Sequence, residues 1–531
     1  MKTRRANAHG ALATAALSLT LTLLGSPEAE AANRPPSIEG TPPTSVTVGA
    51  TYSFTPRASD PDDDRLNFWV RNKPRWLNFN SQTGRLYGVA PQGSQGEYGE
   101  IRIVVSDGEL RDRLPKYSIT VRGQGGGGDP VPSPDPEPDP SDPTTPSGPL
   151  TSIPNVPFNY TQSPGAVTRS GALPTTLRAG EILALGNQTL SDFTLNCNGT
   201  AANPAFVSGG TIRGNDDVLE VRGSWCIFVN TKFDNIQLRT SGDHLVFRNV
   251  EVTNVADKNG SSFGGSNIVV VDSEIHHNQG DDRHGVHVPS GANSIWILRN
   301  HIHHNGGDGF QACHGCSSNP PRNVYLGGNL FHSDRENAID FKYIQNVVVS
   351  GNTIHSLVSA PADQRWCFDD GSGCGTFSSG SDGSGIVIGS DGGPRNVLIT
   401  GNEIYDTRNA VRIEEGAQVR IERNNFHNVV NQCLQLDKDG YGTVYSGNTC
   451  ANSGRGILQN WRENFSLTVA NNTFRNVNGP AVEYESSSVY NSSTLTGNTF
   501  VDSGPVVYGR TVASGEAAIN ALPGAQGNQV D

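Results

Sequence analysis

Two ionisable residues, Asp340 and Lys342, stand two positions apart in the segment RENAIDFKYIQNVVVSGNTI, Arg335 to Ile354. Apolar and polar residues mostly alternate in this segment, which indicates a β-strand with one buried face. Side chains two positions apart then leave the same face, ~6.5 Å from each other along the strand. Lys342 could be a base placed in a groove, or it could only form an exposed ion pair with Asp340, which would contribute little stability.

Further carboxylates lie in the loops that lead into this strand and into the two similar segments before it. The loops read GDDRH (280–284), GGD (306–308) and SDRE (333–336). Hard divalent cations such as calcium bind six to eight oxygens of the kind that carboxylates supply. We therefore expect calcium as a cofactor, with these candidate ligands: Asp282, Asp308, Glu336 and Asp340.

A lysine, an arginine and a cation-binding carboxylate cluster are what β-elimination in a uronic acid polymer requires. The hydrogen at C5 of a uronate becomes acidic once the adjacent carboxylate is neutralised by calcium or arginine, which also stabilise the enolate-like intermediate. A lysine can take this proton if desolvation and neighbouring cations lower its pKa. Lys342 is the predicted base, and Arg412 is the predicted neutraliser or proton donor to the leaving oxygen.

A recurring motif predicts how these residues are positioned. A small or charged residue, an asparagine and an apolar position recur, mostly 22 to 29 residues apart with one gap of 50, at Asn300, Asn329, Asn352, Asn402, Asn424, Asn448, Asn472 and Asn498. Short β-rich repeats form solenoids, because a single coil cannot bury its apolar face alone. We predict an all-β fold, a right-handed parallel β-helix, in which the asparagines stack and satisfy the turn backbone.

Alignment of the coils on these asparagines also aligns a second strand, in segments such as GVHVP, GFQAC, AIDFK and AVRIE. Its second residue is apolar in every coil, so the third and fifth residues must face outward, with ~4.8 Å between coils. They form a polar stripe, which consists of His287, Gln311, Asp340, Lys342, Arg412, Glu414, Gln435 and Asp437. We predict that four residues on or beside the stripe bind substrate: His287, Gln311, Arg335 and Gln435.

With these residues the large module resembles the β-helical polysaccharide lyases. It is most similar to the calcium-dependent pectate lyases of family nine and less similar to the alginate and chondroitin lyases of family six. The resemblance rests on the coil repeat and on ENAIDFKYIQNVVVSGN, whose outward Lys342 matches the proposed family base. It implies an acidic polysaccharide such as pectate or alginate as substrate. The pectate lyases hold calcium in an aspartate-rich cluster, whereas the carboxylates here are spread over several loops.

Three other functions fit the same residues. A glycoside hydrolase would use a carboxylate pair among Asp340, Glu414 and Asp437, although the polygalacturonase motifs, an aspartate pair followed by Gly-His-Gly and Arg-Ile-Lys, are absent from the sequence. A uronate epimerase would share the proton abstraction. A non-catalytic adhesin or carbohydrate-binding solenoid would not need lysine, arginine and carboxylates to converge on one stretch of sheet, so their convergence favours an enzyme.

Two segments precede the large module, which we place at residues 150–531. Residues 33–122 contain alternating runs such as TYSFTPRAS and EIRIVVSDG, which predict a small antiparallel β-sandwich. The stretches ASDPDDDRLNF and PRWLNFNSQTGRLYGVAP resemble the immunoglobulin and cadherin-like modules of bacterial surface proteins and glycanases, which implies an accessory role. Residues 123–149 are rich in glycine, proline and aspartate and are predicted to be a linker.

Residues 1–31 have the features of an export signal. Lys2, Arg4 and Arg5 precede the apolar run ALATAALSLTLTLLG, and Ala29-Glu30-Ala31 forms a small-residue cleavage site. The apolar run is shorter than the ~20 residues that a membrane helix needs. We expect a protein that is secreted, periplasmic or on the cell surface, without membrane insertion.

The charge and the cysteines restrict partners and compartment. The formal net charge is -13, and loss of residues 1–31 would make it about -14 (-13 minus +1), which disfavours nucleic acid as a partner. An acidic polysaccharide would then need local cations in its groove. Eight cysteines suit an oxidising compartment, and we expect a monomer. Local pairs are favoured: Cys197 with Cys226, Cys313 with Cys316, Cys367 with Cys374, and Cys433 with Cys450.

Three remaining features have two interpretations each. The sequence CHGC, Cys313 to Cys316, could be half of a metal site, but no second pair with zinc-like spacing accompanies it. The run HIHHN, His301 to Asn305, is interpreted as a polar bend rather than as a metal site. Trp366 and Trp461 could stack on sugar rings or pack against the protein.

Overall fold

The computed structural model describes residues 33–122 and 150–531, except 49, 63, 75–76, 81–82, 91–95, 108–109, 257–258, 317, 358, 369–373, 390–392, 461–465 and 486–492. The predicted signal segment, the predicted linker and Trp461 lie outside the described residues. The chain divides into two compact units, Met1–Asp129 and Pro130–Asp531, and each is described by itself.

The first unit is built from short, mostly antiparallel strands around a core that includes Tyr52, Leu86, Ile103 and Ile119. Strand β8 lies between β5 and β10, and strand β7 lies between β3 and β6. The alternation of buried and exposed residues that the sequence shows is what lets each strand bury one face. The strands are β1 Ser37–Glu39, β2 Ser45–Thr47, β3 Thr51–Phe54, β4 Arg57–Ser59, β5 Asn67–Arg71, β6 Asn78–Phe79, β7 Leu86–Val89, β8 Gly96–Ser106, β9 Arg111–Arg113 and β10 Tyr117–Arg122.

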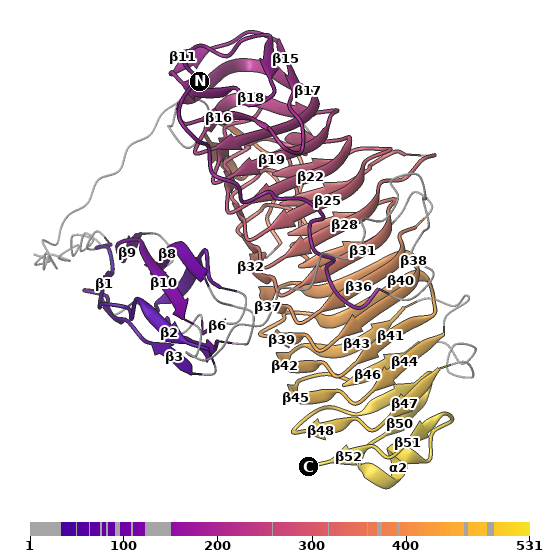
Figure 1. Ribbon diagram of the computed structural model, residues 1–531. Helices are drawn as coiled ribbons and strands as arrows, with labels where there is room; N and C mark the ends of the chain where they lie inside the picture. The colour runs from indigo at the N-terminus through magenta and orange to yellow at the C-terminus, as the bar shows by residue number, and fades with distance from the viewer. Residues whose placement is uncertain are drawn as a thin grey trace, which may run out of the picture. The chain divides into compact units, whose positions relative to one another are not determined.

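The second unit is a parallel β-helix (Figure 1). In the described part of this unit the strands form a continuous path of 40, and between β19 (Asp243–Arg248) and β32 (Thr353–Leu357) each strand also pairs in parallel with the strand three places later. Three strands therefore make one coil. The coils begin with β11 Arg169–Gly171, β12 Thr176–Arg178, β13 Ile182–Leu185, β14 Gln188–Thr189, β15 Phe193–Asn198, β16 Ala205–Ser208, β17 Thr211–Val229 and β18 Lys232–Thr240.

The strands stack into three parallel sheets along the axis of the β-helix, and we name each sheet by a feature of its outer face. The site sheet contains β21 Ser261–Phe263, β24 Val286–Val288, β27 Phe310–Ala312, β30 Ile339–Phe341, β35 Ile386–Ile388, β38 Asn409–Glu422, β40 Gln432–Tyr441, β43 Arg455–Gln459, β46 Val482–Tyr484 and β49 Val506–Tyr508. The histidine sheet contains β20 Glu251–Thr253, β23 Glu274–His276, β26 His301–His303, β29 Leu330–His332, β32 Thr353–Leu357, β37 Glu403–Thr407, β39 Asn425–His427, β42 Thr449–Ser453, β45 Thr473–Val477, β48 Thr499–Val501 and β52 Gln529–Val530.

The third face, the covered sheet, contains β19 Asp243–Arg248, β22 Ser266–Val271, β25 Asn293–Leu298, β28 Arg322–Gly327, β31 Gln345–Ser350, β36 Arg395–Thr400, the second half of β38 (Ala417–Glu422), β41 Thr443–Ser446, β44 Leu467–Ala470, β47 Thr494–Thr496 and β51 Ala525–Gln526. Apolar side chains face outward on its strands from β19 to β36, among them Val246, Val269, Trp296 and Val348, and the chain from Leu150 to Tyr160 packs on them. Trp296 donates a hydrogen bond to the carbonyl of Pro154, and Arg248 donates one to that of Tyr160. This segment therefore gives the sheet a second apolar layer.

Asparagines stack inside the bend between the covered sheet and the histidine sheet, which confirms the predicted ladder. Each side-chain oxygen accepts from the backbone amide of the preceding ladder asparagine, and each amide nitrogen donates onward. The ladder runs from Asn300 through the predicted positions to Asn498 and continues to Asn528. All its members are buried, so the ladder replaces water for the bend backbone.

Replacement of Asn402 by alanine is expected to lower the free energy of unfolding by about 2–4 kcal/mol, because several buried hydrogen-bonding groups lose a partner at once. Asn402 accepts from Asn352 and donates to Asn424 and to the carbonyl of Val349. Chemical denaturation measures the change. The control is Asn425→Ala. Asn425 is exposed on β39, the neighbour of β37 in the histidine sheet, and its replacement should change the free energy of unfolding by less than ~0.5 kcal/mol. Equal effects of both substitutions would contradict the ladder's role.

All eight cysteines pair locally, in the four pairs that the sequence favours. The Cys313–Cys316 disulfide removes the CHGC motif as a metal site, because a disulfide sulfur has no thiolate to offer a metal. The structure also corrects the bend predicted for HIHHN. His301–His303 form strand β26, and the chain turns only after it.

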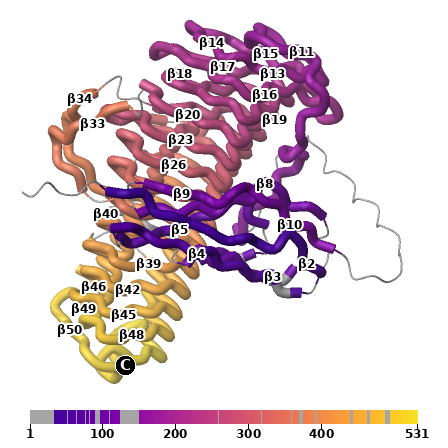
Figure 2. Tube along the Cα trace, turned by 90° about the vertical axis from the view of Figure 1, so that its left-hand side faces the viewer, coloured from indigo at the N-terminus to yellow at the C-terminus, as the bar shows by residue number. Residues whose placement is uncertain are grey.

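The gap of 50 between Asn352 and Asn402 is one insertion between β32 and β35. It contains the antiparallel hairpin of β33 Arg365–Cys367 and β34 Cys374–Thr376, closed by the Cys367–Cys374 disulfide. Figure 2 shows this hairpin projecting from the coils of the β-helix. At the other end of the chain, β50 Thr511–Ala513 turns back on β49, and helix α2 Glu516–Asn520 follows.

Candidate functional site

The strand register of the site sheet places the predicted stripe residues in one row. His287 lies beside Gln311, and Gln311 lies beside Asp340. Val387 comes next, and only then Arg412. Arg412 is therefore two coils from Asp340, a separation of ~9.6 Å. The row has an acidic part around Asp340 and a second charged part around Arg412.

Lys342 follows strand β30 and forms an ion pair with the carboxylate next to it. Its Nζ lies 2.7 Å from Oδ2 of Asp340, and its side chain is 18% exposed. Burial lowers the pKa of Lys342, but the charges of Asp340, Asp308 and Glu414 outweigh burial and raise the pKa above its ordinary value. The condition that we expected for a basic lysine, neighbouring cations that lower its pKa, is therefore not met by these side chains.

Asp308 and Glu336 meet His284 at the edge of the site sheet where the chain enters each strand. The three residues offer ligand atoms within 4.8 Å of one another. Asp308 accepts hydrogen bonds from Asn337 and Gln311, and its own backbone amide donates to Nδ1 of His284. His284 thus has the tautomer with its proton on Nε2, and burial lowers its pKa to about 4, so it is neutral at pH 7.

Asp308, Glu336 and Asp340 form a group that we call the acidic cluster. Their carboxyls lie close together in a largely buried place and repel one another. Burial, which outweighs the hydrogen bonds from Asn337, raises the pKa of Asp308 to about 6. Burial and then the charges of Asp308 and Asp282 raise the pKa of Glu336 to about 8. Burial and then Asp308 raise the pKa of Asp340 to about 7. A cluster of this kind is stabilised by protons or by a cation.

The acidic cluster fits a bound cation. Oδ1 of Asp340 is buried and has no hydrogen-bond partner among the described residues, so one carboxylate oxygen is available beside Asp308 and Glu336. The grouping differs from the predicted ligand set. His284 joins Asp308 and Glu336, whereas Asp282 is exposed at a turn and acts on Glu336 through its charge. Oxygen-rich donor sets suit calcium, while the histidine favours a transition metal.

His284 has no role in the sequence analysis, although a signal for it exists. In the aligned coils it occupies the position of Asp308 and Asn337, directly before the strand. Asp308 donates to His284, and Asn337 donates to Asp308, so this position forms a second ladder between coils. A polar residue that recurs at one position of a solenoid is expected to contact its equivalents in the next coils.

Arg412 is held by three carboxylates. Its nitrogens lie 2.6 Å from Asp437, 3.0 Å from Asp382 and 3.1 Å from Glu414. Burial lowers the pKa of Arg412, but Asp437 and the other two carboxylates raise it above the ordinary value. This argues against Arg412 as a proton donor to the leaving oxygen and leaves it the role of a fixed positive charge.

Arg335 lies away from the stripe and under the insertion. It is 7% exposed, it donates hydrogen bonds to the carbonyls of Ser379 and Pro361, and its guanidinium lies 3.9 Å from the centre of the Phe377 ring. This position leaves little of its side chain for substrate. Asp281 accepts from the amide of Ser378 in the same segment, so the insertion is anchored beside the acidic cluster.

Replacement of Arg335 by alanine is expected to release the insertion, because its hydrogen bonds and its contact with Phe377 are lost. Amide hydrogen exchange of residues 374–384 should become faster by more than tenfold, while the strands of the site sheet keep their protection. Arg365→Ala is the control, since Arg365 lies on the exposed side of the same insertion. Unchanged exchange in the Arg335 variant would show that other contacts hold the insertion.

The other three residues predicted to bind substrate lie on the stripe and differ in burial and in hydrogen bonding. His287 is half-buried, and its Nδ1 lies 3.2 Å from the Ser262 hydroxyl. Gln311 is buried and donates to Asp308, and Gln435 donates to Asp437. Gln311 thus orients a cluster carboxylate, while His287 and Gln435 keep partly exposed side chains. The Trp366 ring lies 5.9 Å from the guanidinium of Arg283, a cation–π distance.

Three family models match parts of the chain. Residues 35–122 match the model described as "Putative Ig domain". Residues 208–433 match "Periplasmic copper-binding protein (NosD)", and residues 375–522 match "Right handed beta helix region". No curated protein matches the sequence. The chain is thus an all-β protein in which an immunoglobulin-like module precedes a right-handed parallel β-helix. The resemblance to pectate lyases stays a prediction.

Several solved structures have a similar fold. PfbA, a surface adhesin of Streptococcus pneumoniae, is 12% identical, covers 57% of this chain and 85% of its own, and has a TM-score of 0.40. The periplasmic alginate epimerase AlgG is 12% identical over 65% of this chain and 84% of its own, with a TM-score of 0.33. The Dettilon tailspike protein is 13% identical over 66% and 62%, with a TM-score of 0.33. Similarities at this level assign no activity.

The four disulfides are typical of a protein that folds outside the cytoplasm, in the periplasm or the extracellular space. Among the described residues, no helix has the length and apolar character needed to cross a membrane.

Proposed function

We propose that this protein cleaves an acidic, uronate-containing polysaccharide by β-elimination, with Lys342 as the base. The observation that carries the proposal is the gathering of three carboxyls with raised pKa, those of Asp308, Glu336 and Asp340, beside Lys342 on an outward-facing sheet. Strong pKa perturbation by burial and charge is concentrated at functional sites. An exposed structural ion pair would not need this cluster around it.

The acidic cluster and Lys342 depend on each other. Asp308, Glu336 and Asp340 are the residues that would hold calcium, which supplies positive charge for the uronate carboxylate when it is bound. The same carboxylates raise the pKa of Lys342, so their neutralisation favours the free amine that a base requires. We therefore expect activity to require a divalent cation.

The elimination balances with groups of this chain and water. Lys342 takes the proton from C5, the C–H electron pair forms the C4–C5 double bond, and the C4–O bond breaks. The leaving oxygen takes a proton from water. Arg412 lies two coils from Asp340 and is paired with Asp382, Glu414 and Asp437, so it takes no part in these bond changes.

To test the proposal, the full protein is incubated with pectate, alginate or a glycosaminoglycan, each with calcium or with a chelator, and the product is identified. Elimination leaves a carbon–carbon double bond conjugated with a carboxylate, which absorbs in the ultraviolet. A rise in absorbance that the chelator abolishes supports the proposal. New reducing ends without the absorbance, or binding without any product, would refute a lyase.

A second candidate is glycoside hydrolysis on the same groove. The observation that favours it is the pKa of Glu336, about 8, and of Asp340, about 7, since an inverting or retaining hydrolase needs a carboxylic acid that is still protonated near neutral pH. Hydrolysis would produce reducing ends and no unsaturated product. A uronate epimerase would produce neither, and proton exchange at C5 in deuterated water would detect it.

We also propose that the protein acts as a monomer with this polysaccharide as its partner, and that the immunoglobulin-like module has an accessory role near the substrate. Light scattering after size exclusion measures the oligomeric state. A stable dimer in solution would contradict the first part of this proposal.

A further inference from the structure

We propose that the histidine sheet contains a binding site for a divalent transition metal of the zinc type, formed by His301, His303 and His332 with Glu274. This site lies on a different sheet from the acidic cluster. It does not depend on the proposed function, because no residue of it takes part in the elimination.

The β-helix register brings these residues together from three successive coils. Glu274 lies beside His301 across strands β23 and β26, and His303 lies beside His332 across β26 and β29. His301 and His303 are two positions apart on β26, so both face outward. The four side chains therefore form a compact square on one face, although Glu274 and His332 are far apart in sequence.

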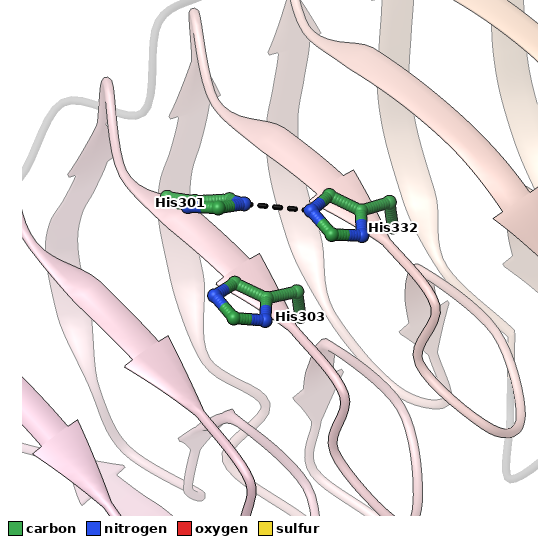
Figure 3. A group of neighbouring side chains, drawn as sticks. All are labelled: His301, His303 and His332. Carbon is green, nitrogen blue, oxygen red and sulfur yellow. Dashed lines mark hydrogen bonds between the residues drawn. The ribbon is translucent and has the colours of Figure 1, made fainter. Parts of the chain in front are cut away.

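Ring nitrogens and a carboxylate oxygen face one another within this square. Nε2 of His301 lies 2.7 Å from Nε2 of His332, as the dashed line in Figure 3 shows. Nε2 of His303 lies 3.3 Å from Oε1 of Glu274, and Nδ1 of His301 lies 3.6 Å from the same oxygen. The three histidines offer ligand atoms that all lie within 4.8 Å of one another.

Contacts on the far sides of two rings orient them for binding. Nδ1 of His303 lies 2.8 Å from Nδ1 of His304, and Nδ1 of His332 lies 3.1 Å from the Ser333 hydroxyl. Each of these contacts leaves Nε2 toward the square. Metal-bound histidines usually have such a partner on their other nitrogen, which fixes the tautomer and the ring orientation.

The donor set identifies the class of metal. Three imidazoles with one carboxylate suit Zn²⁺ and its neighbours in the transition series, whereas calcium and magnesium prefer oxygen donors alone. Zinc–nitrogen bonds are ~2.0–2.1 Å long, and two ligand atoms on one tetrahedral zinc lie roughly 3.3–3.4 Å apart. The 3.3 Å between His303 and Glu274 fits this separation, whereas the Nε2 atoms of His301 and His332, now 2.7 Å apart, must move apart slightly. His301 and His303 are buried and Glu274 is half-buried, so the site lies at the outer surface of the histidine sheet with limited access to solvent.

The bound metal would link three coils that are otherwise joined through the strand ladders and the core. His301–His303 lead directly into the turn that carries Asp308, so the site stabilises the chain next to the acidic cluster. Zinc is then expected to raise the unfolding temperature of the protein, because a metal that binds only the folded state stabilises it.

The experiment is isothermal titration of the untagged, metal-stripped full chain with Zn²⁺, since a histidine tag would itself bind zinc. With Ca²⁺ in excess to occupy the acidic cluster, one equivalent of Zn²⁺ should bind to the wild type. His303→Ala should weaken binding by more than about 100-fold, because even an outer partner of a ligand is worth ~10–100-fold. His427→Gln is the matched control. His427 has the same pairing with a glutamate, Glu403, outside the square, and should leave binding unchanged.

Two further measurements keep the proposal falsifiable. Glu336→Gln should retain zinc binding, whereas its loss there would place the metal in the acidic cluster and overturn the proposal. X-ray absorption of the zinc-loaded wild type should show imidazole scattering from three histidines, independently of how any variant folds. Scattering from oxygen donors alone, or full binding by a folded His303→Ala, would also overturn it.

Discussion

Replacement of Lys342 by alanine is expected to reduce the rate of unsaturated-product formation by about 10²–10⁴-fold, the usual contribution of a positioned general base. The Nζ atom that would take the C5 proton is lost, while the fold is kept, because Lys342 lies on the outer face of the site sheet and is partly exposed. Initial rates of ultraviolet absorbance on the preferred polymer measure the effect, and circular dichroism verifies the fold.

The matched control for this substitution is Lys232→Ala. Lys232 on β18 forms an ion pair with Glu251 of the histidine sheet at 2.7 Å, the same distance as that between Lys342 and Asp340, but away from the site sheet. It should keep the wild-type rate. If the Lys342 variant also keeps the wild-type rate, Lys342 is only an ion-pair partner of Asp340, and the base must be sought elsewhere.

Replacement of Glu336 by glutamine is expected to stabilise the protein at alkaline pH while abolishing its response to calcium. The carboxyl of Glu336 has a pKa of about 8 in the folded protein, against ~4.3 when unfolded. Between these values the folded state binds more protons, so the free energy of unfolding falls as the pH rises from about 4 to about 8. A glutamine side chain does not titrate and does not contribute to this loss.

The expected gain at pH 8.5 is roughly 1–2 kcal/mol, less than the full shift in pKa corresponds to, because Asp308, Glu336 and Asp340 share their protonation. Thermal unfolding at pH 5 and pH 8.5, with calcium and with a chelator, measures both effects. Calcium should stabilise the wild type more at pH 8.5 than at pH 5. Glu485→Gln is the control, since Glu485 is exposed. A variant that is less stable than the wild type at pH 8.5 would contradict the repulsion within the cluster.

Much of the architecture was readable because it repeats. The asparagine ladder from Asn300 to Asn498, the inward apolar position and the outward row of His287, Gln311 and Asp340 all follow from local periodicity. Each coil repeats the same short pattern, so one alignment of the chain with itself reports on every coil. The disulfides were favoured for a different local reason, because the cysteines of each pair are close in sequence.

The electrostatics of the site were not readable in this way. The sequence suggests a lysine whose pKa is lowered, yet the pKa of Lys342 is raised, because Asp308 on the neighbouring coil and Glu414 two coils away add to Asp340. Arg335 stands beside the stripe in the sequence, but the insertion covers it. The pKa of Lys342 and the burial of Arg335 both depend on residues from other coils, and a local sequence pattern does not show which of these residues will be near.

The sequence by itself therefore determined the solenoid, the faces of its strands and the row on which Asp340 and Lys342 stand, because hydrophobic alternation and the asparagine repeat are local properties of the chain. Only the tertiary structure decided which side chains meet between coils: His284 with Asp308, and His301 with His332, which are 31 residues apart. These contacts depend on the lengths of the turns and on the insertion, which set the register between coils and with it the distances over which charges and metal ligands act.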